Sequence, residues 1–166
     1  TEYKKHPVYG YSTLRDETWI SELSKTIVLY HHEKMDGSGF PLKIKNLPLE
    51  ARIVAVCDSF DEMICGICCE RVKVHEALEY LKVFRGKQFD EHVTDVFLEF
   101  IAVYPVGSYV LINSGETGVV VRQNREFSNR PVIKIIKDKK GDTLTIPREI
   151  DLVKEKTVFI EKVLDN

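Results

Sequence analysis

The chain has 166 residues, of which 43% are hydrophobic and 30% charged, and its 24 basic and 26 acidic residues leave a net charge of −2. This composition is typical of a globular protein and excludes collagen-like and low-complexity chains, and such a balanced charge does not favour nucleic acid or an anionic membrane as a partner. The longest apolar runs, such as residues 53–57, are far shorter than the roughly 20 residues of a membrane span. All four cysteines lie within thirteen positions, which favours reduced thiols and a cytoplasmic protein over a disulfide framework.

The first part of the chain, up to Tyr104, predicts helices, because its apolar residues recur at helical spacing. Pro7 is expected to open a first short helix, since its missing N–H costs nothing at the first helical position. A second helix is predicted to continue into His31 and His32. Residues 33–47 are rich in glycine, proline and polar side chains, which predicts a loop. Three more helices are predicted after this loop. The first begins at Pro48, the second covers residues 74–84, and the third follows a cap at Asp90.

Several side chains of these helices are predicted to lie in the core. The helix that begins at Pro48 is expected to bury one apolar stripe, made of Ile53, Val56, Cys57, Phe60 and Ile64. The cysteines match one buried helix face, which favours small core side chains over a zinc or redox site: Cys57, Cys65, Cys68 and Cys69. Trp19 is predicted to be a core anchor.

After Tyr104 the apolar residues alternate or form short β-branched runs, which predicts strands. Five strands are predicted, at residues 109–112, 118–121, 132–136, 143–146 and 158–160. Because closure removes exposed strand edges, we expect a small closed or half-closed β-barrel. The sequence therefore predicts an α+β chain, with a helical domain over residues 1–104 and a small β-rich, barrel-like subdomain over residues 105–166.

Two adjacent histidines, His31 and His32, stand before the predicted loop. A histidine pair at the end of a helix is commonly explained by its favourable interaction with the helix dipole and by hydrogen bonds to the last carbonyl groups. Neighbours on a helix point about 100° apart, so they rarely bind one metal together but can serve two metals that lie side by side. His6 and Asp58 add further ligand types, and imidazole with carboxylate suits Fe, Mn, Ni or Zn. On spacing alone, both interpretations stay open.

Three ordered motifs resemble those of the HD-GYP family: HPVYG at residues 6–10, HHEKMDGSGFP at 31–41 and ARIVAVCDSFDEM at 51–63. The segments FDEHV, at residues 89–93, and YPVGSYV, at 104–110, are similar to the closing helices of that family and to a β-extension of some members. The resemblance implies a helical HD-type phosphodiesterase with two or three divalent metal ions, commonly iron or manganese. Its substrate would be cyclic di-GMP or a related cyclic dinucleotide.

The resemblance also implies roles for individual residues. By motif position, four would be metal ligands: His6, His31, His32 and Asp58. Others would contact the cyclic dinucleotide: Asp36, Gly37, Gly39, Phe40, Pro41, Arg71 and Lys73. Of these, Lys73 matches the family's motif only if a deletion is allowed in the alignment. The family has tyrosine where this chain has Phe40, which keeps an aromatic ring but lacks the hydroxyl. Among the acids after Asp58, Asp61 is a candidate to orient a ligand, and Glu62 is expected to be solvated.

The His-Asp pair that gives the family its name is absent from the 166 residues. We expect the pair to precede Thr1 in a parent protein, together with a sensory or receiver domain. The chain alone would then lack half of the metal shell and have little or no activity. Two alternatives are a non-catalytic module that binds a cyclic dinucleotide or a protein, and an interaction domain whose β-rich part forms a homodimer.

Overall fold

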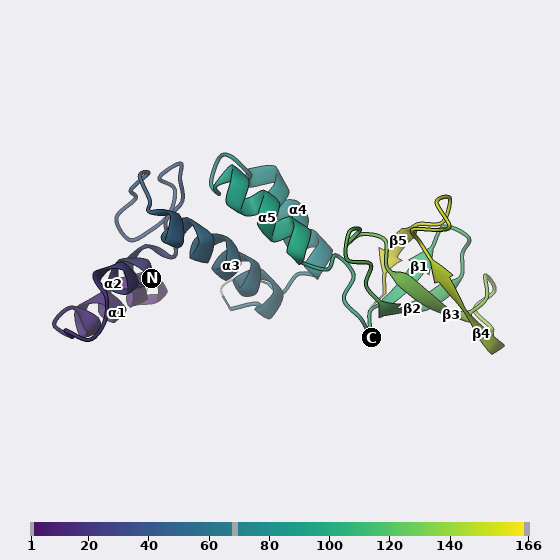
Figure 1. Cartoon of the computed structure of the whole chain (residues 1–166). Helices are drawn as coiled ribbons and strands as arrows, with labels where there is room; N and C mark the ends of the chain where they lie inside the picture. Colours follow the sequence, from purple (N-terminus) through teal and green to yellow (C-terminus); the bar gives the residue numbers. More distant parts are fainter. Residues whose placement is uncertain (1, 68–69, 165–166) are drawn as a thin grey trace. The chain divides into compact units, whose positions relative to one another are not determined.

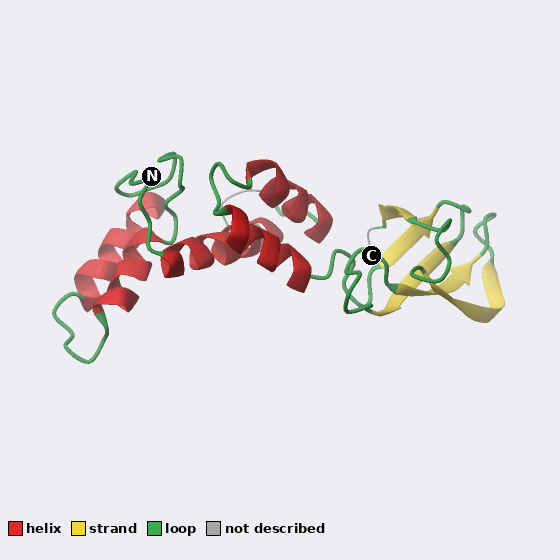
Figure 2. Ribbon diagram, turned by 45° about the horizontal axis from the view of Figure 1, so that its top comes forward, coloured by secondary structure: helices red, strands yellow, loops and turns green. Residues whose placement is uncertain are grey.

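The computed structural model describes residues 2–67 and 70–164, and the chain divides into two compact units, Thr1–Leu98 and Glu99–Asn166. The first unit is built from helices and the second from one antiparallel sheet, as the red helices and yellow strands of Figure 2 show. This confirms the predicted α+β class. The domain boundary predicted at residues 104–105 lies a few residues beyond this division and stays a prediction. In the described part of the chain, no helix has the length and apolar character needed to cross a membrane.

The helical elements follow the predicted order (Figure 1): η1 (Glu2–Lys5), α1 (His6–Leu14), α2 (Glu22–Tyr30), α3 (Leu49–Cys65), α4 (Val74–Phe84) and α5 (Glu91–Phe100). A proline stands in the first turn of α1, as predicted. The side chain of Ser21 caps α2 by accepting a hydrogen bond from the N–H of Ser24 at 3.0 Å. The same helix ends at Tyr30, so His31 is its C-cap and His32 belongs to the loop. The expected continuation of the helix through both histidines is therefore corrected.

Helices α3, α4 and α5 supply the core of the helical unit. Val56, Leu81 and Phe89 are fully buried there, and the side chains packed around them come from the same three helices: Phe60, Met63, Phe84, Val93 and Phe97. The start of α5 is fixed by Asp90, whose Oδ1 accepts a hydrogen bond from the N–H of Val93 at 3.0 Å. The predicted cap at Asp90 is confirmed.

Three predictions about burial are wrong. Cys57 and Cys65 are exposed, because α3 buries a face rotated from the predicted stripe, through Ala51, Ala55, Val56 and Ser59. Ile53 is likewise 43% exposed. Trp19 is 79% exposed, because it lies in the connection between α1 and α2, where its Nε1 donates a hydrogen bond to Glu17. Cys68 and Cys69 lie outside the described residues.

The second unit holds a five-stranded sheet in the order β4-β3-β2-β1-β5, and every neighbouring pair is antiparallel. Its strands are β1 (Tyr109–Ile112), β2 (Thr117–Arg122), β3 (Val132–Lys137), β4 (Thr143–Asp151) and β5 (Ile160–Val163). Over the described residues the edge strands β4 and β5 do not pair with each other, so the sheet is open and the expected closure is corrected. Pro147 within β4 lacks an N–H to donate, which suits an edge strand.

The second unit has an apolar core of its own, formed by Val110, Ile112, Val120, Ile133, Ile135, Ile150 and Leu152. Four of the five strands occupy the predicted segments, although β4 continues to Asp151, and the last strand begins at Ile160, where the prediction ended. Each unit thus has its own hydrophobic core, and the predicted metal ligands all belong to the helical unit.

The helical core gives a stability prediction at Leu81, whose side chain is fully buried. Leu81→Ala is expected to lower the free energy of unfolding of the helical unit by about 2–5 kcal/mol, because it leaves a cavity among α3, α4 and α5. Val83→Ala is the control, since Val83 on the same helix is 62% exposed. Urea unfolding followed by far-ultraviolet circular dichroism measures both changes; equal losses for the two variants would contradict the assigned core.

Candidate metal centre

Four segments of the helical unit bring the predicted ligands together. His6 is the first residue of α1, His31 caps the C-terminus of α2, His32 follows in the loop, and Asp58 lies on α3. His31 keeps helical backbone angles, with φ −62° and ψ −21°, and a turn follows it, in which the N–H of Glu33 donates to the backbone oxygen of Tyr30 at 2.9 Å. The rings of His31 and His32 nevertheless lie together, with centroids 4.2 Å apart. Both neighbours in sequence therefore lie at one centre, at the C-terminal end of α2.

Three imidazole rings converge through their Nε2 atoms. Nε2 of His6 lies 2.9 Å from Nε2 of His31 and 3.1 Å from Nε2 of His32. The Nδ1 atoms of His6 and His31 lie 2.7 Å and 2.8 Å from the backbone oxygens of Tyr3 and Val28. A carbonyl oxygen only accepts hydrogen bonds, so these Nδ1 atoms carry the protons, and the facing Nε2 atoms of the neutral rings present lone pairs.

Two facing lone pairs repel each other at such distances unless a proton or a metal cation lies between them. Burial, followed by the neighbouring His32, lowers the pKa of His31 and favours its neutral form. Neutral imidazole is the form that binds divalent metals such as Fe, Mn, Ni and Zn. The donor set of His6, His31 and His32 therefore fits a divalent cation.

Asp58 faces the other nitrogen of His32. Its Oδ2 lies 3.1 Å from Nδ1 of His32, and this buried oxygen has no hydrogen-bond partner among the described residues. Burial alone would raise the pKa of Asp58, but the nearby His32, His31 and Lys34 outweigh burial and hold the pKa below its ordinary value. Asp58 is therefore an ionised carboxylate with a free acceptor atom next to the imidazole cluster.

Glu62 and Tyr3 also belong to this cluster, and the sequence analysis did not place them there. The side chain of Glu62 is only 20% exposed, and its Oε2 lies 3.9 Å from Nδ1 of His32, so the expectation of a solvated acid is wrong. The hydroxyl of Tyr3 donates a hydrogen bond to Oε1 of Glu62 and lies 3.2 Å from Nε2 of His32. Glu62 follows Asp58 by four residues, so helical spacing could have placed both on one face. Nothing in the spacing of the motifs points to Tyr3.

Asp61, the other acid considered, points elsewhere. It is exposed, and its carboxylate accepts a hydrogen bond from Sγ of Cys65 at 3.6 Å. A residue three positions after Asp58 lies about 60° away from it around the helix, whereas one four positions after it lies within about 40° on the other side. The predicted role of Asp61 in orienting a ligand therefore has no contact that supports it among the described residues.

Lys34 is a half-buried cation beside these carboxylates. Its Nζ donates a hydrogen bond to Oγ of Ser59 at 2.5 Å and lies 4.1 Å from the centre of the Phe89 ring. Burial lowers the pKa of Lys34 to about 8, although Glu62, Asp58 and Asp36 act in the opposite direction. The lysine partly balances the negative charge of the carboxylates on α3.

The loop after the histidines is held in place by Glu33, which is completely buried. Its Oε1 accepts hydrogen bonds from the backbone N–H groups of Leu42 at 2.5 Å and Lys43 at 2.9 Å, so one carboxylate joins the two ends of the loop. Inside this loop, Oδ1 of Asp36 accepts from the N–H of Ser38 at 2.8 Å and forms a tight turn. The loop is thus organised by side chains of the chain itself.

Gly39 and Phe40 bring the loop against the histidines. A Cβ atom on Gly39 would lie only 2.5 Å from the backbone oxygen of His32 and the backbone nitrogen of Lys34, so only glycine fits there. The ring of Phe40 stacks on the ring of His32, with centroids 4.5 Å apart and planes inclined by 25°. A cis peptide bond joins Phe40 to Pro41. Phe40 therefore packs on a predicted ligand, and its predicted contact with a cyclic dinucleotide stays a prediction.

Arg71 and Lys73 lie farther along the chain from the cluster. Arg71 is exposed and lies beside Gly66, the C-cap of α3. Lys73 is the N-cap of α4, where its N–H donates to the carboxylate of Glu76 at 2.8 Å. Eight residues of helix, about 12 Å, separate Asp58 from Gly66. Their predicted binding to phosphate stays a prediction, as does that of Gly37, whose φ of 80° is the left-handed conformation of a turn glycine.

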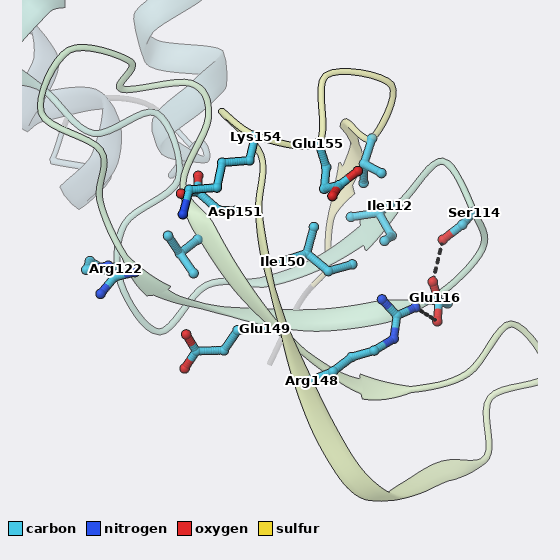
Figure 3. A pocket seen from close by; sticks show the side chains of 12 residues that line it. Ile112, Ser114, Glu116, Arg122, Arg148, Glu149, Ile150, Asp151, Lys154 and Glu155 are labelled. Carbon is cyan, nitrogen blue, oxygen red and sulfur yellow. Dashed lines mark hydrogen bonds and ion pairs between the residues drawn. The ribbon is translucent and has the colours of Figure 1, made fainter.

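The β-rich unit carries a cavity of about 630 Å³ that no motif predicted (Figure 3). Its lining combines apolar side chains of the sheet core, such as Ile112 and Ile150, with charges of both signs. Arg148 and Glu116 form an ion pair at its rim, 2.6 Å apart. The described lining of this cavity contains no histidine, so it does not resemble the histidine cluster.

Comparison with known protein families explains the histidine cluster. A sequence profile of the HD domain matches residues 1–93, more than half of the chain. The chain belongs to the HD domain family. A profile described as a KOW domain associated with HD domain matches residues 109–166, which include every strand of the sheet. The HD domain family is metal-dependent, which agrees with the imidazoles and carboxylates gathered in the HD domain of this chain.

Curated relatives point to one branch of the family. The cyclic di-GMP phosphodiesterase PA4108 of Pseudomonas aeruginosa is 32% identical over 135 residues, which are 80% of this chain and 32% of that protein. The cyclic di-GMP phosphodiesterase response regulator RpfG of Xanthomonas campestris is 39% identical over 99 residues, 57% of this chain and 26% of that protein. A 3'3'-cGAMP-specific phosphodiesterase of Vibrio cholerae is 32% identical over 108 residues, 60% of this chain and 21% of that protein. These names confirm the resemblance to the HD-GYP family; the chain spans about a third or less of each relative.

The stacking of Phe40 on His32 gives a prediction about metal affinity. Phe40→Leu is expected to weaken Co²⁺ binding about tenfold, because a ring that orients a ligand acts as an outer-shell partner. Phe40→Tyr keeps the ring and is expected to bind Co²⁺ as the unchanged chain does. Titration calorimetry and the visible absorption of bound Co²⁺ measure the effect. Phe100→Leu is the control, since Phe100 is 82% exposed; unchanged binding by Phe40→Leu would contradict the positioning role.

Proposed function

We propose that this chain is part of a metal-dependent phosphodiesterase that hydrolyses cyclic di-GMP or a related cyclic dinucleotide. In this proposal His6, His31, His32 and Asp58 are ligands of a divalent metal centre, which takes iron or manganese. The observation that carries the proposal is the convergence of three imidazole Nε2 atoms next to an ionised aspartate. The names of the relatives add support, since each is a cyclic dinucleotide phosphodiesterase.

A bound divalent cation would polarise the phosphoryl group and lower the pKa of a coordinated water, which makes water a nucleophile near neutral pH. The chain's own residues prepare the site for it. The backbone oxygens of Tyr3 and Val28 hold the rings of His6 and His31 so that both Nε2 atoms face inward. The negative charge of Asp58 offsets the charge of the cation, and the ring of Phe40 limits rotation of His32.

The loop at residues 36–41 and the segment that follows α3 are proposed to bind the cyclic dinucleotide. The contacts would come from the residues of the motif match: Asp36, Gly37, Gly39, Phe40, Pro41, Arg71 and Lys73. The loop follows directly after His32 and is held there by Glu33, so a ligand on the cation would lie beside it. The exposed guanidinium of Arg71 suits a phosphate, which it can bind through two parallel hydrogen bonds.

The chain by itself is proposed to be inactive. The His-Asp pair of the family is absent from its sequence, so part of the metal shell must come from other residues. In a longer parent protein, a sensory or receiver domain would accompany the pair, as the name of the response regulator RpfG suggests for that relative. A cytoplasmic setting and a homodimer fit the same proposal.

Binding of a cyclic dinucleotide without hydrolysis is the second candidate function. It is favoured by the way the loop is organised, since the clamp by Glu33 and a hydrogen bond from the N–H of Met35 to the backbone oxygen of Gln88, at 2.9 Å, do not depend on a complete metal shell. In this case the chain binds cyclic di-GMP, Arg71→Ala binds it more weakly, and added metal produces no hydrolysis.

Metal content and turnover test the proposal together. The purified chain is expected to bind Mn²⁺ or Fe²⁺ and to hydrolyse little or no cyclic di-GMP, because its metal shell is incomplete. His31→Ala should lose most of the bound metal, whereas His92→Ala should keep it, since His92 is exposed on α5 and belongs to no group of possible metal ligands among the described residues. Inductively coupled plasma mass spectrometry and chromatography of the nucleotide products give the two readouts. Equal metal in both variants, or rapid hydrolysis by the chain alone, would contradict the assignment.

A further inference from the structure

A lysine of the short helix η1 lies at the edge of the histidine cluster. Lys4 follows Tyr3, whose hydroxyl lies 3.2 Å from Nε2 of His32. Lys4 is exposed, and its Nζ lies over the ring of Phe40, 5.5 Å from the ring centre. The same ring stacks on His32, with centroids 4.5 Å apart. Phe40 therefore connects the ammonium of Lys4 to the candidate metal centre.

The contact with the ring places the charge of Lys4 without using up its hydrogen-bond donors. An ammonium over an aromatic ring is attracted by the negative face of that ring. This attraction orients the charge, and the N–H groups that point away from the ring stay available. Among the described residues, no hydrogen bond or ion pair engages Nζ of Lys4. Lys4 thus presents a positive charge and free donors beside the loop that follows the histidines.

Two other lysines near the cluster differ from Lys4 in this respect. The ammonium of Lys5, the next residue, pairs with Oε1 of Glu2 at 2.8 Å. Lys34 also lies over an aromatic ring, but it is half-buried and donates a hydrogen bond to Oγ of Ser59. Of these three lysines, only Lys4 combines an aromatic contact with donors that no described residue occupies.

The proposed substrate needs a cation at such a place. A cyclic dinucleotide carries two phosphodiester groups, and each has a negative charge. When the metal centre takes the phosphodiester that is cleaved, the other one is left without a counter-charge. The carboxylates of Asp58 and Glu62 in the cluster would repel it. An exposed ammonium on a flexible stem suits this second anion, because lysine binds phosphate as an adaptable point charge.

Phe40 supplies no polar contact of its own. Its ring has no hydroxyl, so stacking is the contact that it offers to a nucleotide. The ammonium over that ring adds the polar contact. Ring and cation together form a surface that matches a flat base with its phosphate, since nucleotides are commonly bound by aromatic side chains beside positive charge.

We propose that Lys4 binds the phosphodiester group of the cyclic dinucleotide that is not cleaved. The inference rests on the proposed function, because it adds a substrate contact to the same site. None of the three sequence motifs includes Lys4, since the first of them begins at His6. Lys4 acts on the substrate and takes no part in holding the metal.

Titration calorimetry of the full chain with cyclic di-GMP, in the presence of Mn²⁺, tests the proposal. Lys4→Met keeps the length of the side chain but removes its charge, and it is expected to raise the Kd about tenfold, the effect of one lost hydrogen bond to a charged group. Lys4→Arg keeps the charge and should recover most of the binding. Lys5→Met is the matched control, since it removes the neighbouring cation, which pairs with Glu2.

Two further measurements separate a contact with the substrate from a structural role. Salt screens exposed charges, so added NaCl should weaken binding by the unchanged chain more steeply than binding by Lys4→Met. The Mn²⁺ content should be the same in both chains, because the described contact of Lys4 is with Phe40 and not with a predicted ligand. Loss of Mn²⁺ from Lys4→Met would show that the substitution disturbs the metal centre, which would overturn the inference.

The outcomes also separate this inference from the proposed function. If the unchanged chain binds cyclic di-GMP and Lys4→Met binds it as tightly as Lys5→Met does, the role of Lys4 is overturned and the proposed function stands. If the unchanged chain binds neither metal nor any cyclic dinucleotide, the proposed function fails and the inference fails with it. Circular dichroism of each variant confirms that lost binding does not come from unfolding.

Discussion

The candidate metal centre depends on one electrostatic constraint: two ring nitrogens that carry lone pairs, Nε2 of His6 and Nε2 of His31, are held 2.9 Å apart. The backbone imposes this arrangement, because the carbonyl groups of Tyr3 and Val28 take the Nδ1 protons of two of the rings. Burial of His31 then disfavours protonation, which would otherwise relieve the repulsion. Helix ends, backbone carbonyls and burial therefore combine to leave an arrangement that a divalent cation satisfies best.

The surrounding contacts maintain that constraint. Phe40 stacks on His32, Glu33 joins the ends of the loop, and the close packing of Gly39 leaves no room for a side chain between loop and histidines. Lys34 places a half-buried positive charge near the carboxylates of α3. The β-rich unit has a separate core, and one ion pair, between Arg148 and Glu116, lines its cavity. The chemistry of the described residues is thus concentrated in the helical unit.

The sequence predicted the order of helices and strands well, because periodicity, proline positions and the cap at Asp90 are local signals. It failed where burial depends on distant partners. Cys57 and Cys65 are exposed because the rotation of α3 in the core is set by α4 and α5, and Trp19 is exposed in the connection between α1 and α2. The open sheet likewise depends on whether the edge strands meet, which strand propensity does not determine. The four predicted ligands came together, and the helical spacing from Asp58 could have indicated Glu62, whereas Tyr3 became visible only through three-dimensional contacts.

The point at which α2 stops has a consequence for how this sequence can vary. His31 is the C-cap of the helix and His32 starts the loop, so the pair lies where the last helical turn passes into the loop. In that turn the backbone oxygen of Val28 lies 2.8 Å from Nδ1 of His31 and fixes the ring. A substitution that distorts this turn would therefore disturb the histidine cluster without replacing a histidine.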